Sequence, residues 1–135
     1  HSSNRRQRQM CIRDRDCYDY SEEVKTLINS VLENPEFIGG TGSFDTKVMK
    51  ASKGKIFCKS GAEGVFLFID IHNEISGVVK ITDGNERAIP ISILNIFKKL
   101  KVMTREELNN LEKKEKFDLK NHAGRNIGHI SLTMK

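Results

Sequence analysis

The fold is decided by the stretch KIFCKSGAEGVFLFIDIHNEISGVVKIT, which occupies residues 55–82. It contains three apolar runs, at residues 55–59, 65–71 and 75–82, separated by turn-forming or polar residues. Runs of this length, rich in β-branched and aromatic residues, are typical of strands, and the short polar connection at 72–74 suits an antiparallel hairpin. The stretch therefore predicts three adjacent antiparallel strands.

The middle run lacks the alternation of a half-exposed strand. Residues 65–69 read VFLFI, so we expect both faces of this strand to be covered. The nearest segment that can cover one face is a predicted helix over residues 88–100, for which Pro90 is acceptable in the first turn. Its apolar stripe consists of Ile89, Ile93, Ile96, Phe97 and Leu100. The expected class is α+β, with helices covering an antiparallel sheet.

The turn between the first two strands carries the candidate chemistry. Lys59, Ser60 and Gly61 place a cation, a hydroxyl and a glycine at the predicted strand end, where a substrate can approach the backbone closely. Serine acyl hydrolases use a Lys-Thr/Ser-Gly triplet in this way. The alternative is a surface lysine before an ordinary turn.

Helices are predicted on both sides of the strands. Asp19 and Glu22 form a capping box for a helix that ends at Asn34, and its apolar stripe must pack on something; the stripe is Val24, Leu27, Ile28, Val31 and Leu32. Residues 36–46 predict a glycine-rich loop without a phosphate-binding signature. Asp45 is predicted to cap a short helix that ends before Gly54.

The C-terminal part is predicted from weaker signals. Thr104 and Glu107 form a second capping box, for a helix that carries Leu108 and Leu111. Residues 121–128 predict a loop, and residues 127–132 predict a last strand. Asp83 and Arg87 are predicted to pair or to hold the start of the preceding helix.

Composition limits the protein class. With 37% hydrophobic residues and no apolar run near the roughly 18 residues of a membrane span, the chain predicts a soluble, cytoplasmic protein without a membrane partner. Cys11, Cys17 and Cys58 are spaced neither as metal ligands nor as a disulfide framework. We expect no disulfide and no metal site in this chain.

The first residues differ from the rest. Residues 1–15 hold five arginines and one aspartate, hence four of the five net positive charges. The segment RQRQMCIRDR at 6–15 resembles translated adapter sequence, so we assign 1–17 to a non-native or disordered segment and 18–135 to the domain. The alternative is a basic arm that binds nucleic acid, but no stacking aromatics are interleaved with the arginines, so no nucleic-acid partner is expected.

Four motifs together resemble one family. They are NPEFIGGTGSFDTKVM (34–49), KSGAEGV (59–65), VKITDGNERA (79–88) and NHAGRNIG (121–128). In this order they are similar to the C-terminal half of the asparaginase II family, of the Rhizobium etli inducible type. The resemblance implies a fold like that of serine β-lactamases and penicillin-binding proteins, and hydrolysis of the side-chain amide of L-asparagine.

The resemblance also implies which site residues this chain carries. Of the catalytic set only Lys59 carries over, with Ser60, Gly61, Ala62 and Glu63 as substrate-binding neighbours. The nucleophilic serine, in a Ser-x-x-Lys motif, and the cysteine and lysine ligands of a zinc ion lie upstream in family members. The implied partner is L-asparagine, with a homodimer allowed, no cofactor in this fragment and zinc allowed in the complete enzyme.

Some alternatives stay open at the sequence level. Asn34 and Ser43 depart from the family, which often has His and Arg there. Ser52 and Lys55 form a local Ser-x-x-Lys, but it runs through a glycine turn into a strand, so we interpret it as accidental. Glu63 either anchors the turn or binds the substrate amine. Other functions compatible with the residues are a different β-lactamase-like acyl hydrolase and a noncatalytic basic binding domain.

Overall fold

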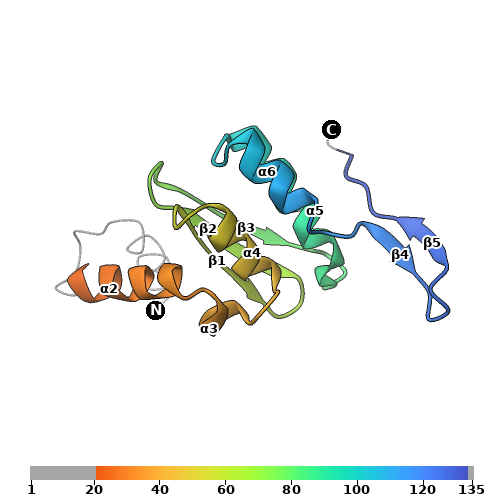
Figure 1. The fold of residues 1–135 in the computed structure, drawn as a ribbon, viewed down its shortest axis with the longest axis horizontal. Helices are drawn as coiled ribbons and strands as arrows, with labels where there is room; N and C mark the ends of the chain where they lie inside the picture. Colours follow the sequence, from red (N-terminus) through yellow and green to blue (C-terminus); the bar gives the residue numbers. More distant parts are fainter. Residues whose placement is uncertain (1–20, 134–135) are drawn as a thin grey trace, which may run out of the picture.

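A computed structural model describes residues 21–133 (Figure 1). The N-terminal elements are α2 (Ser21–Glu33), α3 (Glu36–Gly39) and α4 (Phe44–Ala51). They are followed by strands β1 (Ile56–Gly61), β2 (Val65–Asp70) and β3 (Ile75–Lys80). The C-terminal elements are the 3-10 turn η1 (Glu86–Ala88), helices α5 (Ile89–Leu100) and α6 (Arg105–Glu112), and strands β4 (Asp118–Lys120) and β5 (Asn126–His129).

The predicted antiparallel sheet is confirmed. β1, β2 and β3 pair in that order, and the register places Lys59 opposite Leu67, which in turn lies opposite Val78. The predicted end of β1 is wrong, because the strand continues to Gly61. Lys59 therefore lies within the paired strand, and the turn begins only after Gly61.

Only one face of the sheet is covered within the described residues. Phe66 and Phe68 of β2 are buried beneath helices α4 and α5, whereas Leu67 between them is half-buried and Val78 beside it is 65% exposed. Coverage of β2 on both faces is not observed among the described residues, and coverage by segments outside them stays a prediction. Within the described residues, the continuous apolar sequence of β2 gives one buried face and one partly open apolar face.

Helices α4, α5 and α6 form the layer over the covered face. Phe97 of α5 is fully buried, and its ring meets that of Phe68 edge to face with centroids 5.0 Å apart. This confirms that the helix predicted at 88–100 packs on the sheet. Its predicted stripe is wrong at one end, since Leu100 is 44% exposed and Leu94 is buried instead.

Helix α2 lies at one end of the molecule and is only partly packed (Figure 1). Val31 is buried, but Val24 and Leu27 are exposed, so packing of the whole predicted stripe is not observed among the described residues. Asp19, predicted to start this helix, lies outside the described residues. So do Cys11 and Cys17 and the segment 1–17.

Two local predictions fail between α2 and β1. The loop predicted at 36–46 contains the short helix α3, and helix α4 is capped by Ser43 rather than by Asp45. The backbone N–H of Thr46 donates to Ser43 Oγ at 3.2 Å. Ser43 satisfies an N–H of the first turn, which leaves the Asp45 side chain free to point elsewhere.

The C-terminal predictions are partly confirmed. The capping box of Thr104 and Glu107 is present at the start of α6, and Arg87 pairs with Asp83 at 2.8 Å. The last strand is shorter than predicted and pairs with β4, which the sequence did not indicate. In β4 only Leu119 is half-buried between two exposed charged residues, so no apolar run marks it.

No helix in the described range 21–133 is long and apolar enough to cross a membrane.

Candidate active site

Helix α4 lies along the outer edge of β1 and caps this edge near both ends. The N–H of Ser60 donates to the Asp45 carboxylate at 2.7 Å, and the N–H of Ile56 donates to Ser52 Oγ at 3.3 Å. From Asp45 to Ser52 the helix rises about 10 Å, and from Ile56 to Ser60 the strand extends about 13 Å. Because these two lengths are similar, one helix can reach both ends of the strand edge. The helix supplies polar partners that an edge strand otherwise lacks.

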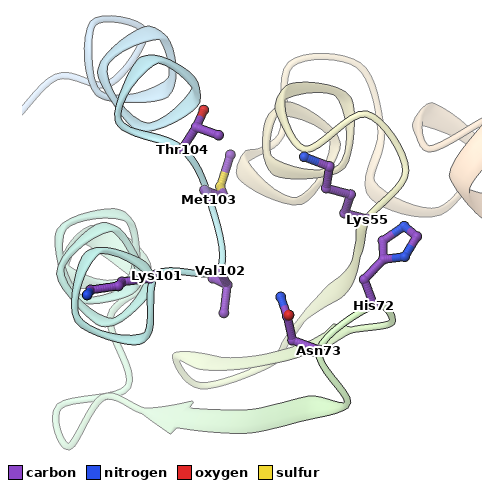
Figure 2. Close-up of a pocket in the computed structure, with 7 residues that line it drawn as sticks. All are labelled: Lys55, His72, Asn73, Lys101, Val102, Met103 and Thr104. Atoms are coloured by element: carbon purple, nitrogen blue, oxygen red, sulfur yellow. The ribbon is translucent and has the colours of Figure 1, made fainter.

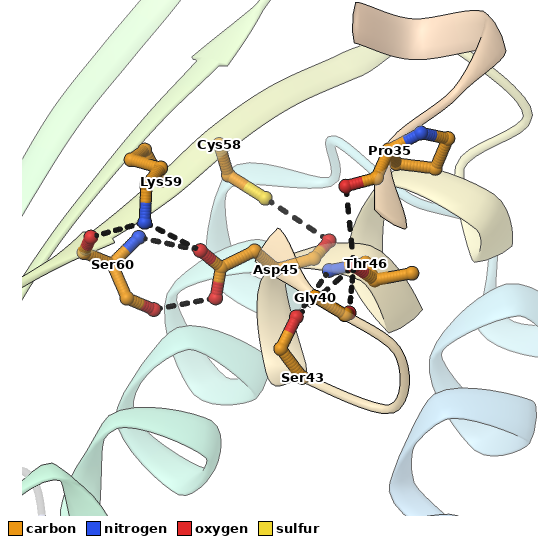
Figure 3. Close-up of polar contacts among 8 residues, drawn as sticks. All are labelled: Pro35, Gly40, Ser43, Asp45, Thr46, Cys58, Lys59 and Ser60. Atoms are coloured by element: carbon orange, nitrogen blue, oxygen red, sulfur yellow. Dashed lines mark hydrogen bonds and ion pairs between the residues drawn. The ribbon is translucent and has the colours of Figure 1, made fainter. Parts of the chain in front are cut away.

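The Asp45 carboxylate joins the two residues that the sequence singled out (Figure 3). Its Oδ1 accepts a hydrogen bond from Ser60 Oγ at 2.5 Å, and its Oδ2, which accepts from the Ser60 N–H, lies 3.6 Å from Lys59 Nζ. Lys59 Nζ also donates to the Ser60 carbonyl at 2.7 Å. The result is a cluster of cation, hydroxyl and buried carboxylate at the sheet edge.

The glycine-rich loop is fixed against this cluster. Thr46 Oγ1 lies 2.8 Å from the Gly40 carbonyl and 3.3 Å from the Pro35 carbonyl, so one hydroxyl ties the loop at two points (Figure 3). A Cβ on Gly39 would lie 2.6 Å from Ser43 Oγ, closer than real side chains come. Gly39 thus permits the close approach between loop and helix start.

A hollow of about 400 Å³ opens beside the cluster. Its lining comes from the loop, the start of α4, strand β1 and the start of α5; the residues are Gly39, Ser43, Phe44, Asp45, Lys59, Ser60, Glu86, Arg87, Ile89 and Pro90. Both cations and carboxylates face this space, so it offers partners to a small ligand that carries charges of both signs.

The predicted substrate-binding residues divide into two groups. Ser60 lines the hollow with Lys59, whereas Gly61, Ala62 and Glu63 are not in its lining. Glu63 is exposed in the turn with φ 59°, and its carboxylate lies 3.7 Å from Lys80 Nζ. Lys80 also hydrogen-bonds the Glu63 carbonyl. These contacts anchor the turn to β3, in agreement with the structural alternative for Glu63.

Ser52 and Lys55 have partners of their own. Ser52 is fully buried, and its hydroxyl donates to the Met49 carbonyl at 3.0 Å while accepting from Ile56. Lys55 Nζ lies 3.4 Å from Glu107 on α6. The hydroxyl is inside the fold and the amine is directed to another carboxylate, which supports the interpretation of this Ser-x-x-Lys as accidental.

A second hollow of about 410 Å³ lies between the β2–β3 turn and the start of α6 (Figure 2). Lys55 and His72 face it from one side, and Met103 and Thr104 from the other. Thr104 and Lys55 are both engaged by Glu107. This hollow contains no nucleophile paired with a base, and we assign no chemistry to it.

The Cys58 thiol lies close to the Asp45 cluster but is not a nucleophile. Burial raises the pKa of this thiol, the Asp45 carboxylate raises it further, and Lys59 lowers it. A thiol in this state stays protonated near neutral pH. Cys58 Sγ contacts the Asp45 carbonyl at 3.5 Å, so its role is in packing.

In residues 21–133, no three His, Cys, Asp or Glu side chains come together as a metal site requires. The resemblance implies cysteine and lysine zinc ligands upstream of the residues present here, and we derive no step through zinc.

Sequence reasoning missed Asp45, Glu86 and Arg87 as site residues. A signal for Asp45 was available, because Asp45, Val48, Met49 and Ser52 recur at helical spacing and define one face. A carboxylate on the apolar face of a helix requires a polar partner. For Glu86 no comparable pattern exists, since it is exposed and its place beside the hollow depends on how α5 packs.

The fold and the cluster define an α+β domain whose sheet edge presents a lysine and a serine held by a buried carboxylate. A family model for L-asparaginase II matches residues 6–132. Because this match covers nearly the whole sequence, the chain belongs to the L-asparaginase II family. No curated protein matches it. The assignment of residues 1–17 stays a prediction, since most of that segment falls within the match but outside the described structure.

Proposed function

We propose that this chain is the C-terminal part of an L-asparaginase of the Rhizobium etli inducible type, which converts L-asparagine to L-aspartate and ammonia. The observation that carries the proposal is the cluster of Lys59, Ser60 and Asp45 beside the hollow, in a chain that belongs to the family. The complete fold is proposed to resemble serine β-lactamases and penicillin-binding proteins. A homodimer and a cytoplasmic location stay predictions.

The proposed reaction is acyl transfer through a serine outside this chain. Its hydroxyl oxygen bonds to the amide carbon, the C–N bond breaks, and ammonia leaves with the proton that the serine gave up. Water then cleaves the ester, which releases aspartate and restores the serine. The Lys59 ammonium would stabilise the negative charge that develops on the amide oxygen, or pass a proton.

The proposal includes that residues 1–135 alone are inactive. The chain has one Ser-x-x-Lys, at Ser52 and Lys55, and both residues make structural contacts. Turnover of L-asparagine by purified 1–135 that is abolished by Ser52→Ala would show that the nucleophile is in this chain.

The test of the site uses the complete protein, obtained by recovering the upstream reading frame. Lys59→Ala should lower kcat on the order of a hundredfold or more, since one preorganised charge is worth about 3–4 kcal/mol in the transition state. Lys59→Arg should not restore it, because the guanidinium is wider and does not exchange a proton near neutral pH.

Lys55→Ala is the matched control and should retain near-normal turnover. The opposite ranking would move the catalytic lysine to Lys55. Release of ammonia from L-asparagine, compared with ring opening of penicillin, separates the asparaginase from the alternative β-lactamase-like acyl hydrolase.

A further inference from the structure

We infer that Asp45 is a positioning residue that holds the Lys59 amine and the Ser60 hydroxyl at the hollow, a role that rests on the proposed function of Lys59. Asp45 does not need to touch substrate for this. Its side chain is only 3% exposed, and the contacts of its carboxylate among the described residues all go to Lys59 and Ser60.

Lys59 needs such a tether because of its place in the strand. In β1 alternate side chains point to opposite faces, and Ile56, Cys58 and Ser60 share the face toward α4. The Lys59 side chain therefore leaves the backbone on the open face of the sheet. Its amine nevertheless reaches Asp45 around the outer edge of β1 (Figure 3). A free lysine has several rotatable bonds and would seldom occupy this one position.

The other end of the β1 edge serves as an internal comparison. There the neutral hydroxyl of Ser52 is enough to accept the N–H of Ile56. At Ser60 the same task falls to a carboxylate, whose burial is unfavourable unless a cation pairs with it. The need to cap the strand edge explains why Asp45 accepts the Ser60 N–H, but it does not explain why the acceptor is a charged carboxylate rather than a neutral group. The nearby charge is that of Lys59, which the carboxylate holds beside the hollow.

The substitution Asp45→Asn separates the capping of the strand edge from the holding of the Lys59 amine. If the asparagine oxygen takes the place of Asp45 Oδ2, it still accepts from the Ser60 N–H, and the NH2 group in the place of Oδ1 donates to Ser60 Oγ, but the amide carries no charge for Lys59. In the complete enzyme, we expect Asp45→Asn to lower kcat at least tenfold with less than a threefold change in KM. In the Lys59→Ala background the same substitution should have little further effect on kcat.

The matched control is Ser52→Ala, which removes the cap at the other end of the same edge. It should lower the melting temperature as much as Asp45→Asn or more, with kcat unchanged. If Asp45→Asn lowers kcat by the same factor with and without Lys59, Asp45 does not act through Lys59 and the inference is overturned. An unchanged kcat in Asp45→Asn overturns it as well.

A measurement on the 1–135 chain keeps this inference distinct from the proposed function. Reductive methylation followed by mass spectrometry reports how accessible each lysine amine is. Lys59 should react severalfold faster in Asp45→Asn than in the parent chain, while Lys55 reacts equally in both. Equal Lys59 rates would overturn the tether. If instead the tether is confirmed and Lys59→Ala leaves kcat normal, the proposed catalytic role of Lys59 is wrong.

Discussion

The two faces of the three-stranded sheet differ more in solvent exposure than in the hydrophobicity of the β2 residues that they present. On the face toward the helices, Phe66 and Phe68 are essentially inaccessible to solvent. On the opposite face, Leu67 is half-buried and Val78 is 65% exposed. Both faces of β2 are apolar, but within residues 21–133 only one of them has helices packed on it. A continuous apolar strand thus indicates how much surface must be covered, and the covering layer comes from other segments.

The largest change in the free energy of unfolding is expected for a substitution on the covered face. Phe97→Ala should lower the free energy of unfolding by about 3–4 kcal/mol, because it removes a fully buried ring that meets Phe68 edge to face. Urea unfolding of the 1–135 chain measures this change.

The control for this prediction is Leu100→Ala on the same helix. Leu100 is 44% exposed, so its truncation should cost less than about 1 kcal/mol. Equal losses for the two variants would mean that α5 does not pack on the sheet as described.

Much of this arrangement could be predicted from the sequence where local signals agree. Strands β1 to β3 carry β-branched and aromatic runs between turn residues, and the capping box of Thr104 and Glu107 is a local pattern that the structure confirms. The open face could not be predicted, because an apolar run such as residues 65–69 does not say which segment covers it. Strand β4 was not predicted because it has no apolar run: two of its three residues are exposed and charged.

The candidate site could be predicted in part. The motif identified Lys59 and Ser60, which do line the hollow. Asp45 was misassigned because a helix-capping role explains an aspartate at that position equally well, and only the fold shows that Ser43 already fills this role. Contacts between residues fifteen positions apart, such as Ser60 and Asp45, depend on tertiary packing that no local pattern contains.

A smaller effect is expected at the polar border of the covered face. Although burial acts to raise it, hydrogen bonds from Thr104 and Lys55 hold the pKa of Glu107 below its ordinary value. A lowered pKa means that the ionised form stabilises the fold. This stabilisation is fully present above the ordinary value of 4.5 and is lost as the pH falls through the lower folded value.

Stability measurements between pH 6 and pH 3 test this. As the pH falls, the free energy of unfolding of the parent chain should decrease by about 0.5–1 kcal/mol more than that of Glu107→Gln, a magnitude typical of a helix cap. Glu112→Gln, an exposed position on the same helix, removes the same charge and should follow the parent chain. A Glu107→Gln chain whose pH dependence equals that of the parent would contradict the assignment.

The smallest effect is expected on the open face, where adjacent residues of β3 provide a matched pair. Val79 packs against the core, whereas Val78 is 65% exposed. In the 1–135 chain, Val79→Ser should cost about 1.5–2 kcal/mol of unfolding free energy and Val78→Ser about 0.5 kcal/mol or less. Equal costs would show that something already covers Val78, for example a second copy of the chain.

The complete protein turns this pair into a test of the proposed fragment. If upstream segments cover the open face, Val78→Ser should cost at least about 1 kcal/mol there, because the substitution would then bury a hydroxyl in place of two packed methyl groups. The Val79→Ser cost should stay nearly the same in both contexts, since Val79 already packs against the core of the described residues. A Val78→Ser cost that remains small in the complete protein would mean that this face stays open to solvent, and that the apolar sequence of β2 is not explained by a second covering layer.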